Sequence, residues 1–361
     1  MNDLIDRQDS YEGTKPVTHA HVFDEERLTR FMENHVRGFE GPIKVDQFKG
    51  GQSNPTYRIT SPSGQYVLRR KPPGKLLKSA HAVDREYRVI SALKAQDFPV
   101  ARPYVLCTDE TVIGTMFYIM ECVNGRIIWN PHIPDAKPDE RTAIFDELNA
   151  TIARLHSIDP QTAGLGDFGK PDGYVARQIS RWSEQYRAST ISEVQEMNQL
   201  MDWLPGACPE RSGVAIVHGD FRLDNTVLHP TEPRILAVLD WELSTLGDPI
   251  ADFTYHMMQW HMPPSKTGAG VGSLVGHDLA ALGIPKAETY IARYCERTGR
   301  SDISNFDFYF AYNFFRMAAI FQGIAGRVRD GTAANPNAAA MESQVAPMAQ
   351  VAWHYAKKAG A

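Results

Sequence analysis

Four polar residues of the sequence have the types and the spacing that phosphoryl transfer requires. Asp220, Arg222 and Asn225 lie in the short segment 217–225, and Asp240 ends an apolar run fifteen residues further on. Transfer from a magnesium nucleotide uses a carboxylate to orient the acceptor hydroxyl, a cation near the γ-phosphate, and an Asn and an Asp as metal ligands. We therefore predict catalytic roles for Asp220, Arg222 and Asn225. Asn225 and Asp240 are the predicted Mg²⁺ ligands.

A second interpretation of the same segment is a polar turn between two apolar strands. Asp and Asn are common in turns because they form hydrogen bonds with their own backbone. The offset between Asp220 and Asn225, together with Asp240 at the end of an apolar run, favours the catalytic interpretation. His218 lies beside Asp220 and not in its place, so we expect it to anchor the loop.

Two further carboxylates, Asp248 and Asp252, lie one helical turn apart and could be taken for metal ligands. Pro249 follows Asp248 directly, which is typical of a helix that begins with Asp248 as its N-cap. We therefore expect Asp248 to cap a helix and Asp252 to support the catalytic loop. Two interpretations of Glu242 remain: it is either a group near the metal or a carboxylate at the start of a helix. His156 is expected to be a packed core histidine.

The composition is that of an ordinary globular protein with a large core. The chain has 361 residues, of which 43% are hydrophobic and 22% charged, and its net charge is −5. This length favours two domains, and the charge argues against a nucleic-acid partner. We find no run long enough to span a membrane, no signal-peptide pattern and no metal-ligand spacing among the four cysteines. We predict a cytoplasmic protein with no membrane partner.

The first third of the sequence alternates short strands and turns with two helices. We expect a polar arm over 1–20 and a nucleotide-binding lobe over 21–122. Asp24 can cap the first helix, and strands over 45–49, 56–60 and 65–70 form an antiparallel meander. A second helix, capped by Ser79, carries Glu86 and precedes strands near 104–108 and 115–121.

From about residue 137 the periodicity is mainly helical. One helix contains residues 144–155, and others are expected over 174–188, 191–204, 248–260, 286–298, 305–328 and 337–358. Only 214–242 has the pattern of strands, and most of the aromatic-rich segment 306–321 should be core. We assign 123–361 to a catalytic and substrate-binding helical lobe, which makes the fold class α+β.

The motifs together resemble the aminoglycoside phosphotransferase family of small-molecule kinases. More narrowly, the chain is similar to the phosphotransferase domains associated with acyl-CoA dehydrogenases. The resemblance rests on five segments in family order: GGQSNPTY at 50–57, YVLRRKPPG at 66–74, AHAVDREYR at 80–88, HGDFRLDN at 218–225 and LDWELSTLGDP at 239–249. It implies a protein-kinase-like two-lobe fold over about 25–355. The smaller lobe would hold an antiparallel sheet and one helix, and the larger lobe would be mainly helical.

The resemblance also implies a nucleotide site in the smaller lobe. Kinase-like folds usually carry a Lys in the third strand, paired with a helix Glu. Here the matching residue is Arg69, a departure from the pattern, and we expect it to pair with Glu86. Arg70 should point the other way because strand side chains alternate.

Backbone groups are expected to make most of the remaining nucleotide contacts. Small residues let backbone N–H groups approach phosphate oxygens closely. The adenine should form hydrogen bonds with the connector that follows the sheet. The residues concerned are Gly50, Gly51, Ser53 and Asn54 for the phosphates, and Glu121 and Val123 for the adenine.

The function implied is that of an ATP-dependent, Mg²⁺-dependent kinase acting on a hydroxyl of a small molecule. Aminoglycosides are polycations, yet segment 253–330 is richer in aromatic and aliphatic residues than in acids. The segment also offers Arg316, Arg327 and Arg329, either as a cationic rim or as ordinary surface charges. We therefore expect a hydroxyacyl compound as acceptor, and a functional link to an acyl-CoA dehydrogenase. The alternative is a catalytically inactive nucleotide-binding regulatory module, which the departure at Arg69 favours. A protein kinase fits poorly because the sequence lacks the Asp-Phe-Gly and Ala-Pro-Glu segments.

Overall fold

The computed structural model describes residues 12–49, 54–72, 82–209, 213–264, 272–330 and 341–361. The chain divides into two compact units. One, called the sheet unit, runs to Ile127 and also takes in Asp224–Ser244; the other, called the helical unit, takes in Ile128–Leu223 and Thr245–Ala361. The chain therefore passes from one unit to the other more than once, and neither unit is a single continuous piece. The division predicted at residues 122 and 123 stays a prediction.

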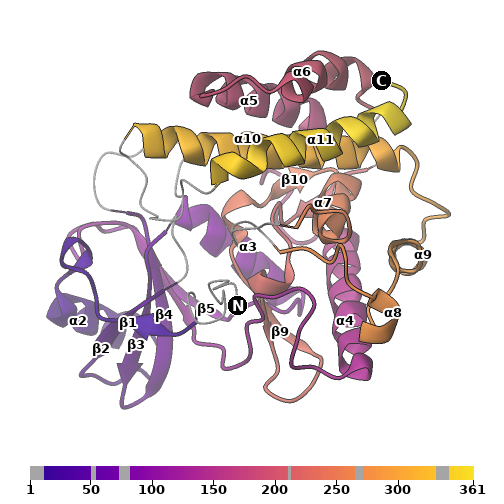
Figure 1. Ribbon diagram of the computed structural model, residues 1–361. Coiled ribbons are helices and arrows are strands. Elements are labelled where there is room, and N and C mark those ends of the chain that lie inside the picture. Colours follow the sequence, from indigo (N-terminus) through magenta and orange to yellow (C-terminus); the bar gives the residue numbers. More distant parts are fainter. Residues whose placement is uncertain (1–11, 50–53, 73–81, 210–212, 265–271, 331–340) are drawn as a thin grey trace, which may run out of the picture. The chain divides into compact units, whose positions relative to one another are not determined.

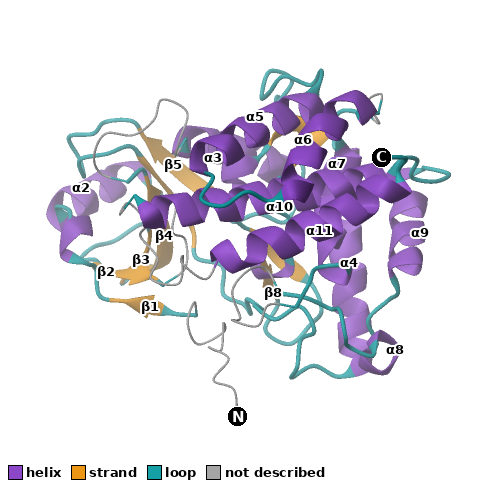
Figure 2. Cartoon of the chain, turned by 45° about the horizontal axis from the view of Figure 1, so that its top comes forward, coloured by secondary structure: helices purple, strands orange, loops and turns teal. Residues whose placement is uncertain are grey.

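An antiparallel sheet of six strands forms the centre of the sheet unit (Figure 2). Its strands are β1 (Thr14–Lys15), β2 (Lys44–Phe48), β3 (Thr56–Ser61), β4 (Gly64–Arg70), β5 (Pro103–Cys107) and β6 (Phe117–Glu121). They are arranged in the order β1-β2-β3-β4-β6-β5. The predicted meander is confirmed, because β2, β3 and β4 pair antiparallel in chain order. The two-residue strand β1 was not predicted, and it is defined by its pairing with β2.

Two helices of the sheet unit, α2 (Glu25–His35) and α3 (Val83–Ala95), follow the predicted positions, and a short 3-10 turn, η1 (His19–His21), precedes them. The Asp24 side chain caps α2 by accepting a hydrogen bond from the backbone N–H of Arg27 at 2.9 Å. The prediction that Ser79 caps the second helix was wrong, because α3 begins at Val83 with Ala82 as its N-cap and without a side-chain capping bond. Ser79 itself lies outside the described residues.

Strand β4 is buried from residue 66 to residue 70, so both of its faces are covered. Tyr66 and Leu68 belong to the apolar core shared with α2. Arg69, on the alternate face, forms an ion pair with Glu86 of α3. Arg70 points the other way, as predicted, with its guanidinium over the ring of Phe23. The period of two along a strand thus places one arginine on each face.

A hairpin from later in the chain completes the sheet unit. It consists of β8 (Thr226–Leu228) and β9 (Ile235–Val238), and the 3-10 turns η2 (Leu223–Asn225) and η3 (Trp241–Leu243) flank it. Arg126 and Leu228 exchange two backbone hydrogen bonds of 2.8 Å. A Cβ at Gly125 would lie 2.2 Å from the Leu228 carbonyl oxygen. Glycine at 125 is therefore required for this close approach of two backbones.

The helical unit contains long helices and a two-stranded ribbon. The helices are α4 (Pro138–Ser157), α5 (Tyr174–Ser189), α6 (Gln195–Ala207), α7 (Pro249–Met257), α8 (Leu279–Leu282), α9 (Ala287–Thr298), α10 (Phe306–Arg329) and α11 (Glu342–Lys358), with the 3-10 turn η4 (Met258–Trp260) after α7. The ribbon pairs β7 (Ala215–Val217) with β10 (Thr245–Gly247). Every helix predicted for this part of the chain is present. Neither α8 nor β10 was predicted, because each is too short to show a periodic pattern.

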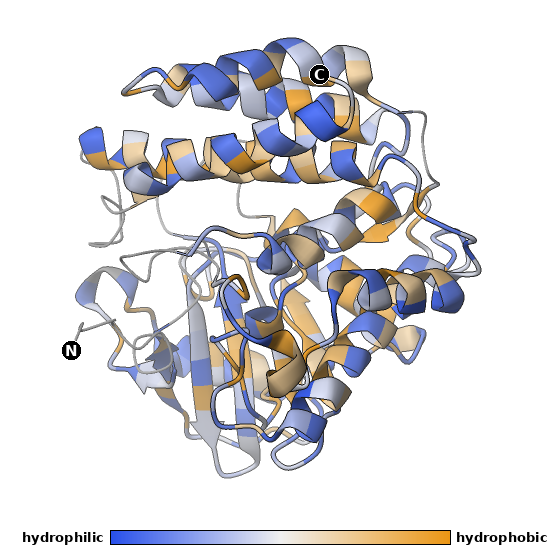
Figure 3. Cartoon of the chain, turned by 45° about the vertical axis from the view of Figure 1, so that its right-hand side comes forward, coloured by the Kyte–Doolittle hydropathy of each residue, from blue (hydrophilic) through white to orange (hydrophobic). Residues whose placement is uncertain are grey.

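Helix α10 is the core of the helical unit. It packs against α5, α6, α7 and α11, and it lies alongside α11 in Figure 1. Most of its residues are buried, including the predicted aromatic positions Phe308, Phe310 and Phe314. Figure 3 shows hydrophobic and hydrophilic residues along the helices of this unit. Within the described part of the chain, no helix has the length and apolar character needed to cross a membrane.

Candidate active site

The loop after β7 is fixed by backbone hydrogen bonds. Gly219 has a φ of 84°, in the left-handed region that glycine adopts without steric cost. The N–H groups of His218 and Gly219 each donate to a carboxylate oxygen of Asp252 at 2.8 Å. The N–H of Asp220 donates to Nδ1 of His218 at 3.2 Å. Asp252 and His218 therefore hold the loop in the way that the sequence predicted.

Asp252 is in turn held by a buried histidine. Nε2 of His156 lies 3.2 Å from Asp252, and Nδ1 of His156 lies 2.8 Å from the Tyr294 hydroxyl. Burial alone would raise the pKa of Asp252, but the hydrogen bonds from His156 and the His218 backbone lower it below its usual value. Asp248 caps α7 by accepting from the N–H of Ile250 at 2.8 Å. Both carboxylates thus have structural partners.

Asp220 is the partly exposed carboxylate of the loop, with 22% of its side chain accessible. Its Oδ1 accepts a hydrogen bond of 2.6 Å from the hydroxyl of Tyr255 in α7. The same oxygen lies 3.3 Å from Nε of Arg222. The structure therefore brings the predicted base and the predicted cation together. Tyr255 was missed because it lies outside the recognised motifs, 35 residues from Asp220.

Arg316 is not the exposed rim cation that its place in the sequence suggested. It is 5% exposed, and its Nη2 donates to the carbonyl oxygen of Gly219 at 2.7 Å. Its guanidinium lies 4.8 Å from the centre of the Tyr255 ring. The expectation was wrong because α10 is apolar around its whole circumference, and every position in its middle is therefore buried. Arg327 and Arg329 are exposed.

The two predicted metal ligands, Asn225 and Asp240, both lie in the sheet unit. The N–H of Leu239 donates to the carbonyl oxygen of Asn225 at 2.8 Å, and this bond continues the pairing of β8 with β9. The ends of the two strands are therefore adjacent. Asp240 has φ 64° and ψ 62°, a left-handed conformation that is uncommon outside glycine but that Asp and Asn adopt most readily.

Arg69 connects three carboxylates of the sheet unit. Its Nε lies 2.7 Å from Glu86, and its Nη2 lies 2.6 Å from Asp240 and 3.5 Å from Glu242. Although burial disfavours its charge, Glu86 and Asp240 raise the pKa of Arg69 above its usual value. The expected Arg69–Glu86 pair is present. Contact with Asp240 was not expected, and it places Arg69 beside a predicted metal ligand.

Neutral donors complete the surroundings of Glu86. Nδ2 of Asn54 donates to Glu86 at 2.7 Å and to Glu242 at 3.4 Å. The hydroxyl of Tyr118 donates to Glu86 at 3.1 Å. Burial raises the pKa of the Glu86 carboxyl, while Arg69 and Tyr118 act against that rise. Glu242 therefore belongs to this cluster, in addition to lying in the 3-10 turn η3.

The structure describes only some of the other residues that were predicted to bind the nucleotide. Gly50, Gly51 and Ser53 lie outside the described residues. Glu121 ends β6, and its carboxylate accepts a hydrogen bond of 3.1 Å from the backbone N–H of Arg102. Val123 follows β6 and is half-buried. The role of Glu121 and Val123 in adenine binding stays a prediction.

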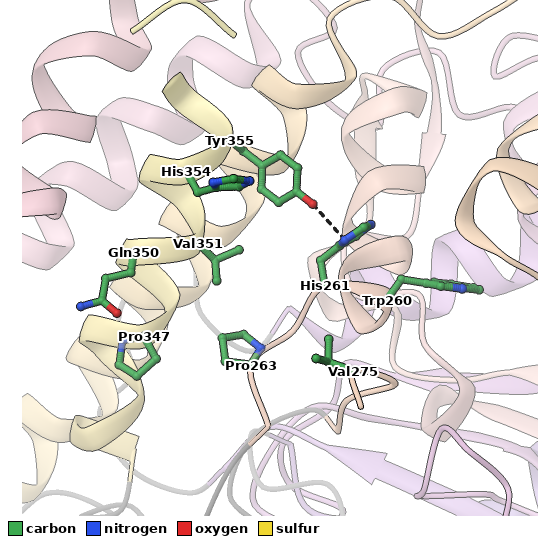
Figure 4. Close-up of a pocket in the computed structure, with 9 residues that line it drawn as sticks. All are labelled: Trp260, His261, Pro263, Val275, Pro347, Gln350, Val351, His354 and Tyr355. Atoms are coloured by element: carbon green, nitrogen blue, oxygen red, sulfur yellow. Dashed lines mark hydrogen bonds between the residues drawn. The ribbon is translucent and has the colours of Figure 1, made fainter. Parts of the chain in front are cut away.

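The helical unit also contains a pocket of about 490 Å³, between the end of η4 and α11 (Figure 4). The hydroxyl of Tyr355 and Nδ1 of His261 lie 2.9 Å apart at its wall. None of the nine described residues that line it carries a carboxylate. They are Trp260, His261, Pro263, Val275, Pro347, Gln350, Val351, His354 and Tyr355.

Known proteins share both the sequence and the fold of this chain. The model of the phosphotransferase enzyme family matches residues 44–299. Acyl-CoA dehydrogenase family member 10 of Mus musculus is 41% identical over 349 residues, a match that covers 96% of this chain and 32% of that protein. The chain thus spans about a third of the length of that curated relative.

Two solved structures illustrate the fold. A Ralstonia eutropha protein, provisionally assigned as an aminoglycoside phosphotransferase, has a TM-score of 0.84 at 50% identity, and the match covers 93% of this chain and 99% of that chain. Spectinomycin phosphotransferase in complex with ADP and spectinomycin has a TM-score of 0.60 at 10% identity, with coverages of 92% and 99%.

Proposed function

Because the chain belongs to the phosphotransferase enzyme family, we propose that it is an ATP-dependent kinase that transfers the γ-phosphate to a hydroxyl of a small molecule. The predicted family and the kinase-like two-lobe α+β fold are confirmed. Membership of the family supports phosphotransferase activity toward a hydroxyl. ATP as the donor is supported by the ADP bound to spectinomycin phosphotransferase. The single observation that carries the proposal is the loop in which Asp220 accepts from Tyr255 and faces Arg222.

The predicted magnesium ligands have the chemistry that Mg²⁺ prefers. Asp240 offers a carboxylate with 34% of its side chain exposed, and Asn225 offers an amide oxygen. Mg²⁺ takes hard oxygen ligands and is usually bound by one or two protein side chains together with phosphate oxygens. Among the described residues, no group of three or more His, Cys, Asp or Glu side chains could hold a metal by itself. The two predicted ligands, Asn225 and Asp240, therefore suit a metal ion that binds together with the nucleotide.

The chain's own residues would act by positioning and by charge. Asp220 would accept a hydrogen bond from the acceptor hydroxyl, orient it and take its proton late in the transfer. Arg222 would neutralise charge that develops on the γ-phosphate. When bound, Mg²⁺ would neutralise negative charge on the phosphate oxygens. Arg69, held by Glu86, would present its guanidinium in the place of the usual lysine.

The acceptor that we propose is a hydroxyacyl compound and not an aminoglycoside. A polycation would be bound by carboxylates. In this proposal the acceptor instead lies in the pocket beside α11, whose described lining has no carboxylate and is largely apolar. Such a lining suits an acyl chain. The name of the mouse relative supports a functional link to an acyl-CoA dehydrogenase. Cys107, Cys122, Cys208 and Cys295 are free thiols, which supports a reducing, cytoplasmic location.

One observation favours the alternative of an inactive nucleotide-binding module. Arg69 replaces the usual lysine and contacts Asp240 at 2.6 Å, so this arginine competes with a metal for the same carboxylate. An inactive module would bind the nucleotide without consuming it. The two functions therefore differ in turnover and not in binding.

Thermal unfolding with millimolar Mg-ATP tests the nucleotide site. Ligand that binds only the native state stabilises it by about 2.7 kcal/mol at 100 times its Kd, so the melting temperature should rise. Asp240→Asn should reduce the shift obtained with Mg-ATP because it removes a charged metal ligand. A folded wild-type protein that shows no shift would contradict the proposal.

A screen of ATP consumption then separates the kinase from the inactive module. Amino sugars, amino alcohols, sugars and hydroxyacyl-CoA thioesters are the acceptors to compare, each with Mg-ATP. We expect the highest kcat/KM for a hydroxyacyl compound. A much higher kcat/KM for kanamycin-like amino sugars would overturn the acceptor assignment. Binding of Mg-ATP without turnover on any acceptor would favour the inactive module.

A further inference from the structure

Two residues from outside the recognised motifs hold the Asp220 carboxylate and its backbone. Tyr255 of α7 donates a hydrogen bond of 2.6 Å to Oδ1 of Asp220. Arg316 of α10 donates one of 2.7 Å to the carbonyl oxygen of Gly219, directly before Asp220. The side chain and the peptide of the same loop position are therefore each bound from a different helix.

Tyr255 is the donor in its hydrogen bond with Asp220. It is buried, at 6% exposure. Burial and the neighbouring charge of Asp220 raise the pKa of Tyr255 above its usual value, so at neutral pH the phenol keeps its proton and donates it in the hydrogen bond to the carboxylate. A short hydrogen bond to an ionised acceptor is among the stronger contacts in proteins. Tyr255 thus restricts the rotation of the Asp220 carboxylate without competing for protons.

Arg316 connects the two contacts. Its guanidinium lies 4.8 Å from the centre of the Tyr255 ring and 5.8 Å from that of Trp182. A cation over an aromatic face is attracted to it, and more strongly when both groups are buried. Arg316 therefore holds the ring of Tyr255 and the peptide of Gly219 at once. Through these two contacts Arg316 stabilises the loop that carries Asp220.

From this arrangement we infer that Tyr255 and Arg316 are positioning residues for phosphoryl transfer, because they set the orientation of the Asp220 carboxylate toward the acceptor hydroxyl. The inference rests on the proposed function, in which Asp220 orients that hydroxyl. Reaction rates depend steeply on the placement of such a group, since a misplacement of about 1 Å costs about 100-fold. Neither residue touches the reacting atoms, so both act through Asp220.

The test is Tyr255→Phe, which removes one hydroxyl and keeps the ring under Arg316. We expect kcat to fall at least about tenfold, since the bond to an ionised group is lost, while KM for ATP and for the acceptor stays within about twofold. The matched control is Tyr312→Phe. Tyr312 of α10 is fully buried, and its hydroxyl has no hydrogen-bond partner among the described residues. This control should keep the wild-type kcat.

Turnover is measured with the best acceptor from the wild-type screen, and Mg-ATP hydrolysis with water as acceptor is measured beside it. Arg316→Lys provides a second variant that keeps the charge and loses the planar fork. It should also lower kcat at constant KM. The double variant should lose less than the product of the two single effects, because both act on one carboxylate.

Melting temperatures of all variants show whether each one is folded. Tyr255→Phe with a kcat within twofold of the wild type would overturn the inference, and so would a change in KM alone. Neither result would affect the proposed function, since the wild type would still be a kinase. Failure of the proposed function would appear instead as a wild-type protein without turnover.

Discussion

Each unit buries an arginine that contacts its predicted site residues or their loop, Arg69 in the sheet unit and Arg316 in the helical unit, and these two arginines are compensated in different ways. Arg69 of the sheet unit lies within 3.5 Å of three carboxylates, those of Glu86, Asp240 and Glu242. Arg316 of the helical unit is bound by a carbonyl oxygen and lies over aromatic rings. Arg69 contacts carboxylates directly, whereas Arg316 contacts a carbonyl dipole and aromatic rings, with the charge of Asp220 further away.

The difference indicates what each arginine is suited to do. A cation among several carboxylates can change partners when other charged groups arrive, because alternative contacts of similar strength are nearby. A cation held by a carbonyl and rings has no equivalent second position, and it fixes the groups around it. We therefore associate the cluster of Arg69 with nucleotide and metal binding, and the cluster of Arg316 with the geometry of the loop that carries Asp220.

The largest expected effect is on turnover. Asp220→Asn should lower kcat by about 10²–10⁴-fold, the usual contribution of a positioned acid–base group, and should leave the Mg-ATP-induced rise in melting temperature nearly intact. Asp278→Asn is the matched control, because Asp278 caps α8 through the N–H of Ala281 and Asn caps a helix equally well. If Asp220→Asn abolished nucleotide binding as well, the separation of roles between the two clusters would be wrong.

The second test compares the stability cost of removing each arginine. Arg69→Met leaves the buried carboxylate of Glu86 without its charged partner, so the free energy of unfolding should fall by about 3–5 kcal/mol. Arg316→Met leaves one carbonyl unsatisfied and should cost about 1–3 kcal/mol. Arg293→Met, which breaks a partly exposed pair with Asp146, should cost less than about 1 kcal/mol. Chemical denaturation of the three variants measures this order, and a reversed order of the first two would refute the comparison.

The third test uses a buried group held only by neutral partners. His256 of α7 has the Phe221 carbonyl oxygen and the Tyr290 hydroxyl as its hydrogen-bond partners. Burial lowers its pKa from 6.5 to about 4. The unfolded chain therefore binds a proton below pH 6.5 that the folded protein accepts only near pH 4. This group's contribution to stability is present above pH 6.5 and is lost as the pH falls toward 4.

His256→Gln should remove this part of the pH dependence. The wild-type free energy of unfolding should fall by up to about 3 kcal/mol more than that of the variant between pH 7 and pH 4. His354→Gln, an exposed histidine of α11, is the control for replacing a histidine as such. Denaturation at a series of pH values provides the measurement, and parallel curves for wild type and His256→Gln would rule out this assignment.

The features that could be predicted from the sequence are those that depend on local pattern. Asp24 was recognised as a cap because capping involves residues three positions apart. The opposite directions of Arg69 and Arg70 follow from the period of a strand. The Arg69–Glu86 pair was predicted from the resemblance to a family, because periodicity alone does not specify which residues form a pair.

The contacts that could not be predicted join distant parts of the chain. Arg69 reaches Asp240 across 171 positions, and a periodic pattern shows which face is buried but not which residue meets it. The contact of Tyr255 with Asp220 was not predicted for the same reason. Arg316 is a different case, because the apolar character of α10 on all sides already indicated that its middle is buried. The strand β10 was missed because three residues carry too little pattern.

The left-handed backbone at Asp240 limits which residues evolution can place there. Glutamate would keep the carboxylate, but at this φ of 64° a residue of its kind costs roughly 1–2 kcal/mol. Glycine would suit the backbone and remove the proposed metal ligand, and asparagine would suit the backbone and remove its charge. Aspartate meets both demands at little cost. If Asp240 binds magnesium as we propose, the residue at this position should distinguish relatives that keep this chemistry from those that have lost it.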